Sequence, residues 1–172
     1  MTKKPCSYSL AVKTSHVLPP DTNNHGTLFG GALMSHIDDV AAISAVRHAR
    51  KPVVTASMDS VDFLHPVRRG DSICVEAFVT WTHNTSMEVF VKAVTEDLLD
   101  GTRKVCATAF LTFVAVDEEG RPVPVPDVYP EQDFEKWLHE GAPARAQQRR
   151  EGRKHSQNFA EMFGTDYPWH RD

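Results

Sequence analysis

Cysteine is scarce in this 172-residue sequence, and its spacing excludes a disulfide framework. The three cysteines, Cys6, Cys74 and Cys106, contain no CxxC pair and are odd in number, which indicates reduced thiols. Apolar runs of the length that spans a bilayer are also missing. The basic N-terminus lacks the apolar core of a signal peptide. We therefore expect a cytoplasmic protein that has no membrane partner.

Positive charge is not in excess, and several common catalytic and phosphate-binding motifs are absent. The formal net charge of −4 at pH 7 leaves no electrostatic footprint for a nucleic-acid partner. The sequence has no GxSxG of an α/β-hydrolase, and neither a P-loop nor GxGxxG. HExxH is missing too, and His25, His36 and His48 lack metal-ligand spacing, so we interpret them as polar surface or supporting residues. We expect no metal and no cofactor.

What the sequence does contain is one helical segment, at residues 32–48, among five segments with strand character. The strand patterns lie at residues 7–14, 53–64, 72–82, 87–93 and 104–116. This order, with hairpin signals late in the chain, predicts an α+β fold in which a mainly antiparallel sheet packs against one long helix. A change of phase near Asp59 and Ser60 predicts a β-bulge in the second of these strands.

The segment after the last strand has less regular patterning. Residues 122–126 can be extended, but their prolines prevent full pairing in a sheet. Residues 131–139 predict a short helix, and residues 144–154 are polar and arginine-rich, so they are either helical or disordered. We therefore expect a folded domain over residues 8–120 and a C-terminal extension over residues 121–172 that is partly helical or disordered.

The long helix carries the first candidate catalytic residue, Asp38. One stripe of the helix is apolar: Leu33, Ile37, Val40 and Ser44. The opposite side is small and apolar: Met34, Ala41, Ala42 and Ala45. Because such a helix is buried, a carboxylate at Asp38 needs a partner or a function. Asp39 lies about 100° further round, and one of the two aspartates can lie at the helix surface instead. The three alanines beside Asp38 also predict a surface for close approach by a second chain.

The loop before the helix ends in Gly30-Gly31. Backbone N–H groups at a helix start have no intrahelical partner and carry the positive end of the helix dipole. Glycine lets a ligand approach them closely, although a glycine pair also occurs as a simple tight turn. Together with Asp38 two turns further on, the pair predicts a site where one end polarises a carbonyl and the other activates water.

These residues belong to motifs that follow one another in a fixed order over about residues 8–120. The first group is Pro20-Asp21-Thr22-Asn23, Gly26, Phe29-Gly30-Gly31, Met34-Ser35 and Ile37-Asp38. The second group is Asp62-Phe63-Leu64-His65-Pro66, Gly70-Asp71 and residues 109–117. With these motifs the sequence resembles the hotdog-fold acyl-CoA thioesterases, in particular the small bacterial acyl-CoA hydrolases related to the brain-type acyl-CoA hydrolase.

The resemblance implies a hotdog fold, in which an antiparallel sheet wraps round a long central helix. It implies hydrolysis of fatty acyl-CoA to free fatty acid and CoA without a metal or cofactor. It also implies a homodimer at least, and favours a hexamer built as a trimer of dimers, with sites between two chains. By position, Asp38 is the catalytic acid, as base or nucleophile. Asn23 faces that acid from the partner chain, and the Gly31 N–H is the oxyanion donor.

Further residues are expected to bind the substrate: Gly30, His25, Ser57, Asp59, Arg68 and Ser86. CoA also carries phosphates, which need cations near the mouth of the site. The candidates for this role are Arg68, Arg69, Lys104 and Arg121. Each of these is also the kind of side chain that is often no more than a solvated charge.

Two other functions remain as alternatives. An acyl-thioester dehydratase or hydratase of hotdog architecture needs an acid and a histidine that converge on the substrate, and His36 and His25 are the nearby histidines. A module that binds acyl-CoA without turnover is disfavoured by Asp38, because a carboxylate in an apolar groove weakens the binding of an acyl chain. Release of free thiol or new enoyl absorbance separates the three functions.

Overall fold

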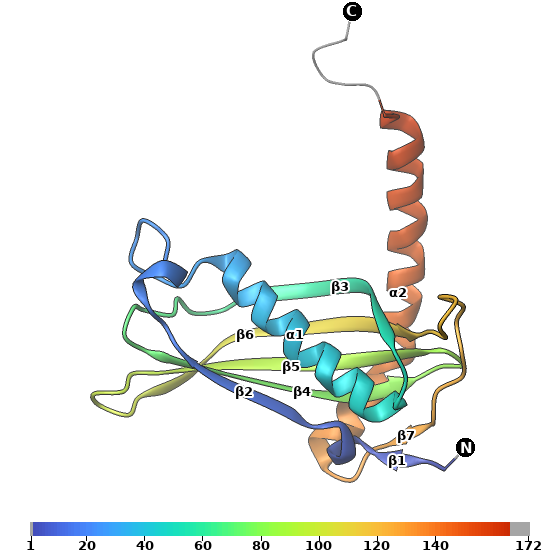
Figure 1. Cartoon of the computed structure of the whole chain (residues 1–172), viewed down its shortest axis with the longest axis horizontal. Coiled ribbons are helices and arrows are strands. Elements are labelled where there is room, and N and C mark those ends of the chain that lie inside the picture. The colour runs from blue at the N-terminus through green and yellow to red at the C-terminus, as the bar shows by residue number, and fades with distance from the viewer. Residues whose placement is uncertain (1, 166–172) are drawn as a thin grey trace, which may run out of the picture. The chain divides into compact units, whose positions relative to one another are not determined.

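The computed structural model describes residues 2–165, and its main feature is an antiparallel sheet with one long helix across its inner face (Figure 1). The helix is α1, Gly30–Ala49. The strands of the sheet are β2 (Ala11–His16), β3 (Val53–Phe63), β4 (Ser72–Thr82), β5 (Ser86–Glu96) and β6 (Arg103–Ala115). The remaining elements are β1 (Lys4–Pro5), β7 (Val128–Tyr129), two 3-10 turns at Cys6–Ser9 and Pro19–Asp21, and the helix α2 (Asp133–Phe163).

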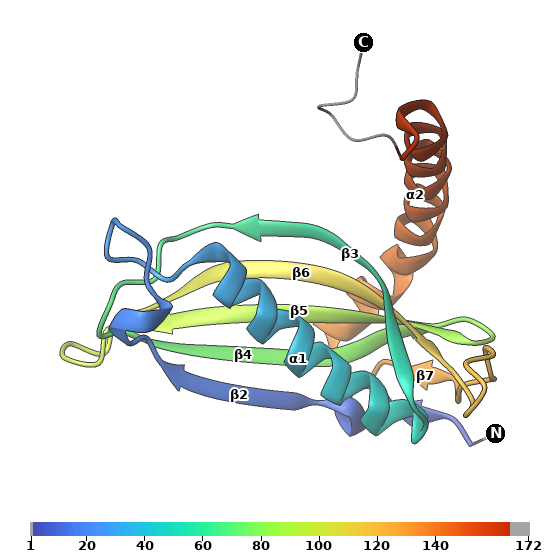
Figure 2. The same ribbon diagram turned by 45° about the horizontal axis from the view of Figure 1, so that its top comes forward.

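The five strands lie in the order β2-β4-β5-β6-β3, and every neighbouring pair is antiparallel. Tight turns join β4 to β5 and β5 to β6, whereas β3 reaches the far edge of the sheet after α1 (Figure 2). Among the described residues, β3 pairs only with β6, so its outer edge is unpaired. The expected α+β fold is confirmed, and the arrangement is that of a hotdog.

The predicted apolar stripe of α1 is the face that the sheet covers. Leu33, Ile37 and Val40 are between 0% and 3% exposed, and they pack against the inner side chains of the central strands. The helix ends at Arg50, whose backbone is left-handed at φ 54° and whose N–H donates to the Val46 carbonyl. Pro52 follows two residues later, where the helix cannot continue. The fold therefore fixes which side of α1 faces away from the sheet.

Of the three alanines of α1 that predict a surface for a second chain, Ala42 is partly exposed and the other two are buried. Ala41 and Ala45 are 0% exposed, because they pack against the sheet of their own chain. The buried side of α1 is thus wider than the four-residue stripe, and it also takes in small residues on its flank. The exposed apolar residues of α1 are instead Met34, Ile43 and Val46, at 41% to 44% exposure.

His48 is not a surface residue but a buried part of the core. It is 0% exposed, and its Nε2 lies 2.8 Å from the carbonyl oxygen of Pro126. Burial is the main cause that lowers the pKa of His48, so the ring is neutral at pH 7 and donates its Nε2 proton to that carbonyl. His48 therefore ties the end of α1 to the extended segment before β7.

The strand β3 contains the predicted bulge and a second one that the sequence did not indicate. Ser60 has a positive φ of 48°, and the pairing with β6 shifts between Asp59 and Asp62. A further shift lies between Thr55 and Ser57, so Ala56 is an extra residue. Simple alternation places residues 54, 56 and 58 on one face, but the extra residue reverses the phase after Thr55.

The first predicted strand, residues 7–14, begins later than expected. Residues Cys6–Ser9 form a 3-10 turn, and β2 starts at Ala11. The Ser9 hydroxyl donates to the Cys6 carbonyl at 2.8 Å and accepts the N–H of Val79 at 2.8 Å. A side chain thus takes the place of a strand hydrogen bond, which the alternation of apolar residues does not reveal.

The chain divides into two compact units after His139. The first unit includes the start of α2, where Glu135 caps the helix by accepting the N–H groups of Glu131 and Gln132 at 2.7 and 3.0 Å. In the second unit α2 continues through Pro143 to Phe163, so the expected break after residue 139 is wrong. Residues 166–172 of the predicted extension lie outside the described residues. No helix in the described part of the chain is long and apolar enough to cross a membrane.

Candidate active site

The loop before α1 is shaped by the side chain of Asn23. Its Oδ1 accepts the backbone N–H groups of His25 and Thr27 at 2.9 and 3.3 Å, and its Nδ2 donates to the Thr27 hydroxyl at 2.9 Å. This is an Asx turn, in which a side chain replaces a backbone acceptor. Asn23 therefore holds its own loop, and one of its two amide hydrogens is left for another contact. His25 is exposed at the tip of this loop.

The loop brings the backbone N–H groups of Gly30 and Gly31 to the start of α1, where they point out of the helix. The N–H groups of Ala32 and Leu33 both donate to the Phe29 carbonyl, at 2.9 and 3.1 Å. Within residues 2–165, no acceptor takes the N–H of Gly30 or Gly31. Unpaired donors at the positive end of a helix dipole suit a developing negative charge. The α1 start can therefore polarise a carbonyl oxygen.

A side chain at position 31 would collide with the Phe29 ring in its present position. A Cβ atom on Gly31 would lie 2.5 Å from Cε1 of Phe29, closer than real atoms approach. Phe29 is 58% exposed, so its ring has room to move into solvent. By contrast, a Cβ atom on Gly30 would make an ordinary 3.7 Å contact with the Phe63 ring. A side chain at position 31 would displace Phe29 and stand in front of the N–H groups.

Asp38 is half-buried on α1, and its carboxylate is held by the neighbouring edge strand. The hydroxyl of Thr55 on β3 donates to Asp38 Oδ1 at 3.0 Å. Asp39 is exposed and forms an ion pair with Lys13 at 2.8 Å, as a surface aspartate does. The geometry therefore favours Asp38 over Asp39 as the acid of the site. The sequence around Thr55 did not identify it as a site residue, because threonine is common in strands.

Gly31 and Asp38 lie on the same side of α1 but two turns apart. Seven residues separate them, which is about 10 Å along a helix axis. Seven steps of about 100° also return to within about 20° of the starting direction. A group held at the N–H of Gly31 is thus distant from the carboxylate of the same chain.

Three of the predicted substrate-binding residues lie on the other face of the sheet. Ser57 and Asp59 pair with Thr112 and Phe110 of β6. The Phe110 ring contacts Phe90, which in turn contacts Phe78 beneath the first turn of α2. Ser57 and Asp59 thus face away from α1.

Ser86 lies on the same outer face as Phe90, because it is four residues before it on an unbroken stretch of β5. One chain therefore does not bring these three residues to Asp38.

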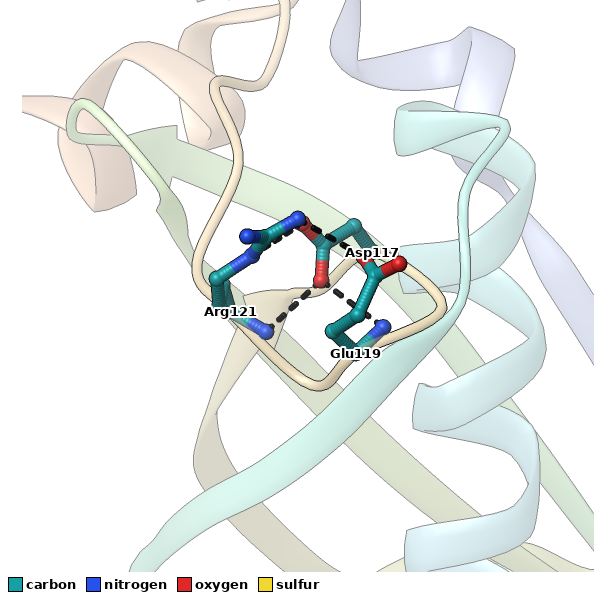
Figure 3. A network of polar contacts seen from close by, with 3 residues as sticks. All are labelled: Asp117, Glu119 and Arg121. Carbon is teal, nitrogen blue, oxygen red and sulfur yellow. Dashed lines mark hydrogen bonds and ion pairs between the residues drawn. The ribbon is translucent and has the colours of Figure 1, made fainter.

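The candidate phosphate-binding cations are also spread over the molecule. Arg121 is paired with Asp117 at 2.9 Å and with Glu119 at 2.7 Å in the turn after β6 (Figure 3). Its backbone N–H donates to Asp117 and is the largest cause that lowers the pKa of that carboxyl. This turn adjoins Pro52, at the opposite end of α1 from the glycines. Arg121 is thus already neutralised by its own loop.

Arg68 and Lys104 do share a cleft near the α1 start, of about 250 Å³. Carboxylates line the same cleft: Asp71, Asp97 and Asp100. The two cations therefore give this cleft no excess of positive charge.

A second cleft, of about 260 Å³, lies directly beside Gly30 and is mostly apolar. It is lined by Leu28, Leu33 and residues 63–67. Sequence reasoning did not single out Phe63 or Leu64 as site residues, although both belong to a motif of the resemblance. Their exposure, 54% and 52%, is high for large apolar side chains that end a strand. Such an exposed apolar surface is typical of a ligand-binding groove.

Comparison with known proteins places this geometry in a family. The sequence profile of the Thioesterase superfamily matches residues 25–102. The uncharacterized acyl-CoA thioester hydrolase YkhA of Bacillus subtilis is 58% identical over 164 residues, which is 95% of each chain. The crystal structure of an acyl-CoA hydrolase from Bacillus cereus superposes with a TM-score of 0.93 at 50% identity, over 96% of this chain and 100% of that one.

An acyl-CoA hydrolase from Staphylococcus aureus, in complex with butyryl coenzyme A, coenzyme A and coenzyme A disulfide, has a TM-score of 0.89 at 45% identity. The match covers 95% of this chain and 99% of that one. The sequence likeness is high over nearly the full length in all three cases. The chain therefore belongs to the thioesterase superfamily, as an acyl-CoA thioester hydrolase.

Proposed function

We propose that this enzyme hydrolyses acyl-CoA with the Gly31 N–H as oxyanion donor. The carboxylate of Asp38 is the general base that activates water. The observation that carries the proposal is the occurrence of both chemical groups on one helix. The N–H groups at its start have no acceptor in the described chain, and a half-buried carboxylate two turns on is held by Thr55. Gly30 supplies a second N–H at the same place.

The chemistry needs little beyond these groups. Asp38 takes a proton from water while the water oxygen bonds to the thioester carbonyl carbon. The negative charge that develops on the carbonyl oxygen is stabilised by the N–H of Gly31 at the positive helix end. When the C–S bond breaks, the electron pair leaves with sulfur and the CoA thiolate takes up the proton. A direct attack by Asp38, giving an anhydride that water then cleaves, uses the same residues.

A comparison of spacing supports Asn23, Asp38 and Thr55 as members of the site. Three variants of the Staphylococcus aureus enzyme, at 44% to 45% identity, replace an asparagine, an aspartate and a threonine by alanine. In that enzyme the three residues are 15 and 17 residues apart in this order. Asn23, Asp38 and Thr55 have the same identities and the same separations. We therefore assign Thr55 as a positioning residue for Asp38.

The site is proposed to be shared between two chains. The separation of about 10 Å along α1 leaves Gly31 and Asp38 of one chain too far apart to act on one carbonyl directly. The unpaired edge of β3, which carries Thr55, is a natural place for a second chain to add. In such a dimer Asn23 would use its remaining amide hydrogen near the partner's acid.

A hexamer is the proposed assembly. It is supported by an acyl-CoA thioesterase described as hexameric, which is 48% identical to this chain with a TM-score of 0.86 over 88% of it. The catalytic fold is proposed to span residues 8–120. A cytoplasmic location is supported by the rat cytosolic acyl coenzyme A thioester hydrolase, which is 39% identical over 132 residues. The match covers 76% of this chain and 35% of that enzyme.

The rival hydratase chemistry finds less support in the geometry. His36 is two residues from Asp38 on α1, and residues at that spacing do not face each other. Burial is the main cause that lowers the pKa of His36. His25 donates its backbone N–H to Asn23 and is exposed. Within residues 2–165, no histidine forms a hydrogen bond or an ion pair with Asp38.

The test is a panel of saturated and 3-hydroxylated acyl-CoAs in which free thiol and enoyl absorbance are followed together, because dehydration to an enoyl-CoA requires the 3-hydroxyl group. Wild-type enzyme should release thiol, and Asp38→Asn should lower the rate by about 10² to 10⁴-fold without loss of folding. Asp39→Asn is the matched control, because Asp39 is the neighbouring aspartate and forms a surface ion pair. Enoyl absorbance without thiol would establish the hydratase instead. An Asp38→Asn enzyme of normal rate would remove Asp38 from the mechanism.

A further inference from the structure

The apolar cleft beside α1 begins where the thioester carbonyl would be held. The ring of Phe63 lies against Gly30, at 3.7 Å from where a side-chain carbon of that residue would stand. Leu33, one turn into the helix, forms the floor of the cleft and is 3% exposed. One end of the cleft is therefore next to the N–H groups of Gly30 and Gly31. One of the two substituents of the thioester carbonyl can enter the cleft from this end.

The walls of the cleft favour the acyl chain over the pantetheine arm. The backbone N–H groups of Leu64 and His65 both donate to the Cys106 carbonyl, at 2.8 and 3.3 Å, and that of Leu28 donates to Val67. The lining side chains are apolar except for His65. The amides of pantetheine would lose their hydrogen bonds to water here without finding new partners. A hydrocarbon chain loses nothing of that kind.

The far end of the cleft excludes the phosphates of CoA for a second reason. His65 and Pro66 border both this cleft and the polar cleft beyond it. In the polar cleft the carboxylates of Asp71, Asp97 and Asp100 outnumber the cations of Arg68 and Lys104. The backbone N–H of Thr102 lowers the pKa of Asp100, so this carboxyl stays ionised. A phosphate group would meet net negative charge in that direction.

We propose that the cleft lined by Leu28, Leu33 and residues 63–67 is the acyl-chain subsite, and that His65 and Pro66 set the longest chain it accepts. The inference rests on the proposed function, and it adds the identity and the length of the group that is bound. A chain that passes His65 and Pro66 brings methylene groups among charged side chains, where they gain no burial. The enzyme is therefore selective for short acyl chains.

Leu64 offers a test with a matched control. It lines the cleft and is 52% exposed, so its replacement should leave folding intact. Leu98, in the turn after β5, has the same 52% exposure but borders neither of the two clefts. The experiment measures kcat/KM by thiol release from acetyl- to hexadecanoyl-CoA, for wild type, Leu64→Trp, Leu64→Ala and Leu98→Ala. Thermal unfolding is recorded for each protein.

The expected result is a change in length preference that is confined to Leu64. Leu64→Trp should lower kcat/KM for the longest accepted chain by about fourfold for each methylene it displaces. The loss with acetyl-CoA should be smaller than the loss with the longest accepted chain, since a two-carbon acyl group ends near Gly30. Leu64→Ala should extend activity to longer chains, and Leu98→Ala should match wild type.

Three outcomes would count against this subsite. Thiol release with an unchanged length profile in both Leu64 variants would refute the acyl subsite and leave the thioesterase function standing. The same is true if Leu98→Ala shifts the profile as much as Leu64→Ala. Absence of thiol release from every acyl-CoA with wild-type enzyme would instead overturn the proposed function, and this inference with it.

Discussion

Replacing Thr55 by valine tests how the carboxylate of Asp38 is held. Valine keeps the shape and the β-branching of threonine but removes the hydroxyl that donates to Asp38 Oδ1 at 3.0 Å. A hydrogen bond to a charged group contributes about 1.5–3 kcal/mol when it is buried. Thr55 is exposed and Asp38 is half-buried, so water can replace part of the bond and about 1 kcal/mol is a better expectation. We therefore expect kcat to fall about fivefold to tenfold.

The assay is thiol release at saturating acyl-CoA, with KM measured alongside. Because Thr55 positions the acid and does not bind the substrate, KM should stay within about twofold of wild type. Thr55→Ser restores the hydroxyl and should recover most of the rate. Thr14→Val is the matched control, since Thr14 is exposed on the other edge strand, β2. A Thr55→Val enzyme with wild-type kcat, or a Thr55→Ser enzyme as slow as the valine variant, would refute the reasoning.

Two further predictions concern the two ends of α1. Gly31→Val should lower activity by about 10²-fold or more with little loss in thermal stability, because the exposed Phe29 ring can swing into solvent; full activity on acetyl-CoA would assign the oxyanion to other donors. Burial lowers the pKa of His48 below its ordinary 6.5. At mildly acidic pH the unfolded chain therefore binds a proton at this residue that the folded chain does not bind. The free energy of unfolding should fall as pH drops below about 6.5. The Lys4 ammonium also lowers the pKa of His48, whereas the hydrogen bond to the Pro126 carbonyl raises it. Burial lowers the pKa of His36 as well, so His36 adds to the same dependence of stability on pH. Thermal unfolding from pH 7.5 to 5.5 should therefore depend less on pH in His48→Gln, and an equal dependence would contradict the assignment.

Much of the fold follows from local patterns in the sequence. The alternation in the strands, the turn residues between them and the apolar stripe of α1 each specify one element, and only an antiparallel sheet against the helix buries all their apolar faces. The errors occur where a residue's role depends on distant partners. His48 has the position of a helix-end cation, but the segment before β7 covers it. Residues 131–139 predict a short helix, yet α2 continues to Phe163.

The residues of the candidate site also divide into those that a short stretch of sequence reveals and those that depend on distant partners. Gly31 and Asp38 could be proposed as site residues because a helix start and a carboxylate on an apolar helix are visible in a short stretch of sequence. Thr55 could not be found, since its contact with Asp38 joins two elements whose register is a property of the folded sheet. Ser57 and Asp59 lie close to the predicted bulge near Asp59 and Ser60. The second bulge at Ala56, which alternation does not reveal, turns both toward the outer face.

The central claim is that each catalytic site joins Asp38 of one chain to the loop of another, and subunit mixing tests it most directly. Asn23→Ala and Asp38→Ala enzymes, each of low activity alone, are co-expressed or refolded together, and subunit exchange is verified by mass spectrometry. In a mixed dimer with shared sites, one of the two sites receives both native residues, so random mixing should restore activity to about a quarter of wild type. If exchange occurs and activity stays at the level of the separate variants, Asn23 and Asp38 act within one chain, and the shared-site account is wrong.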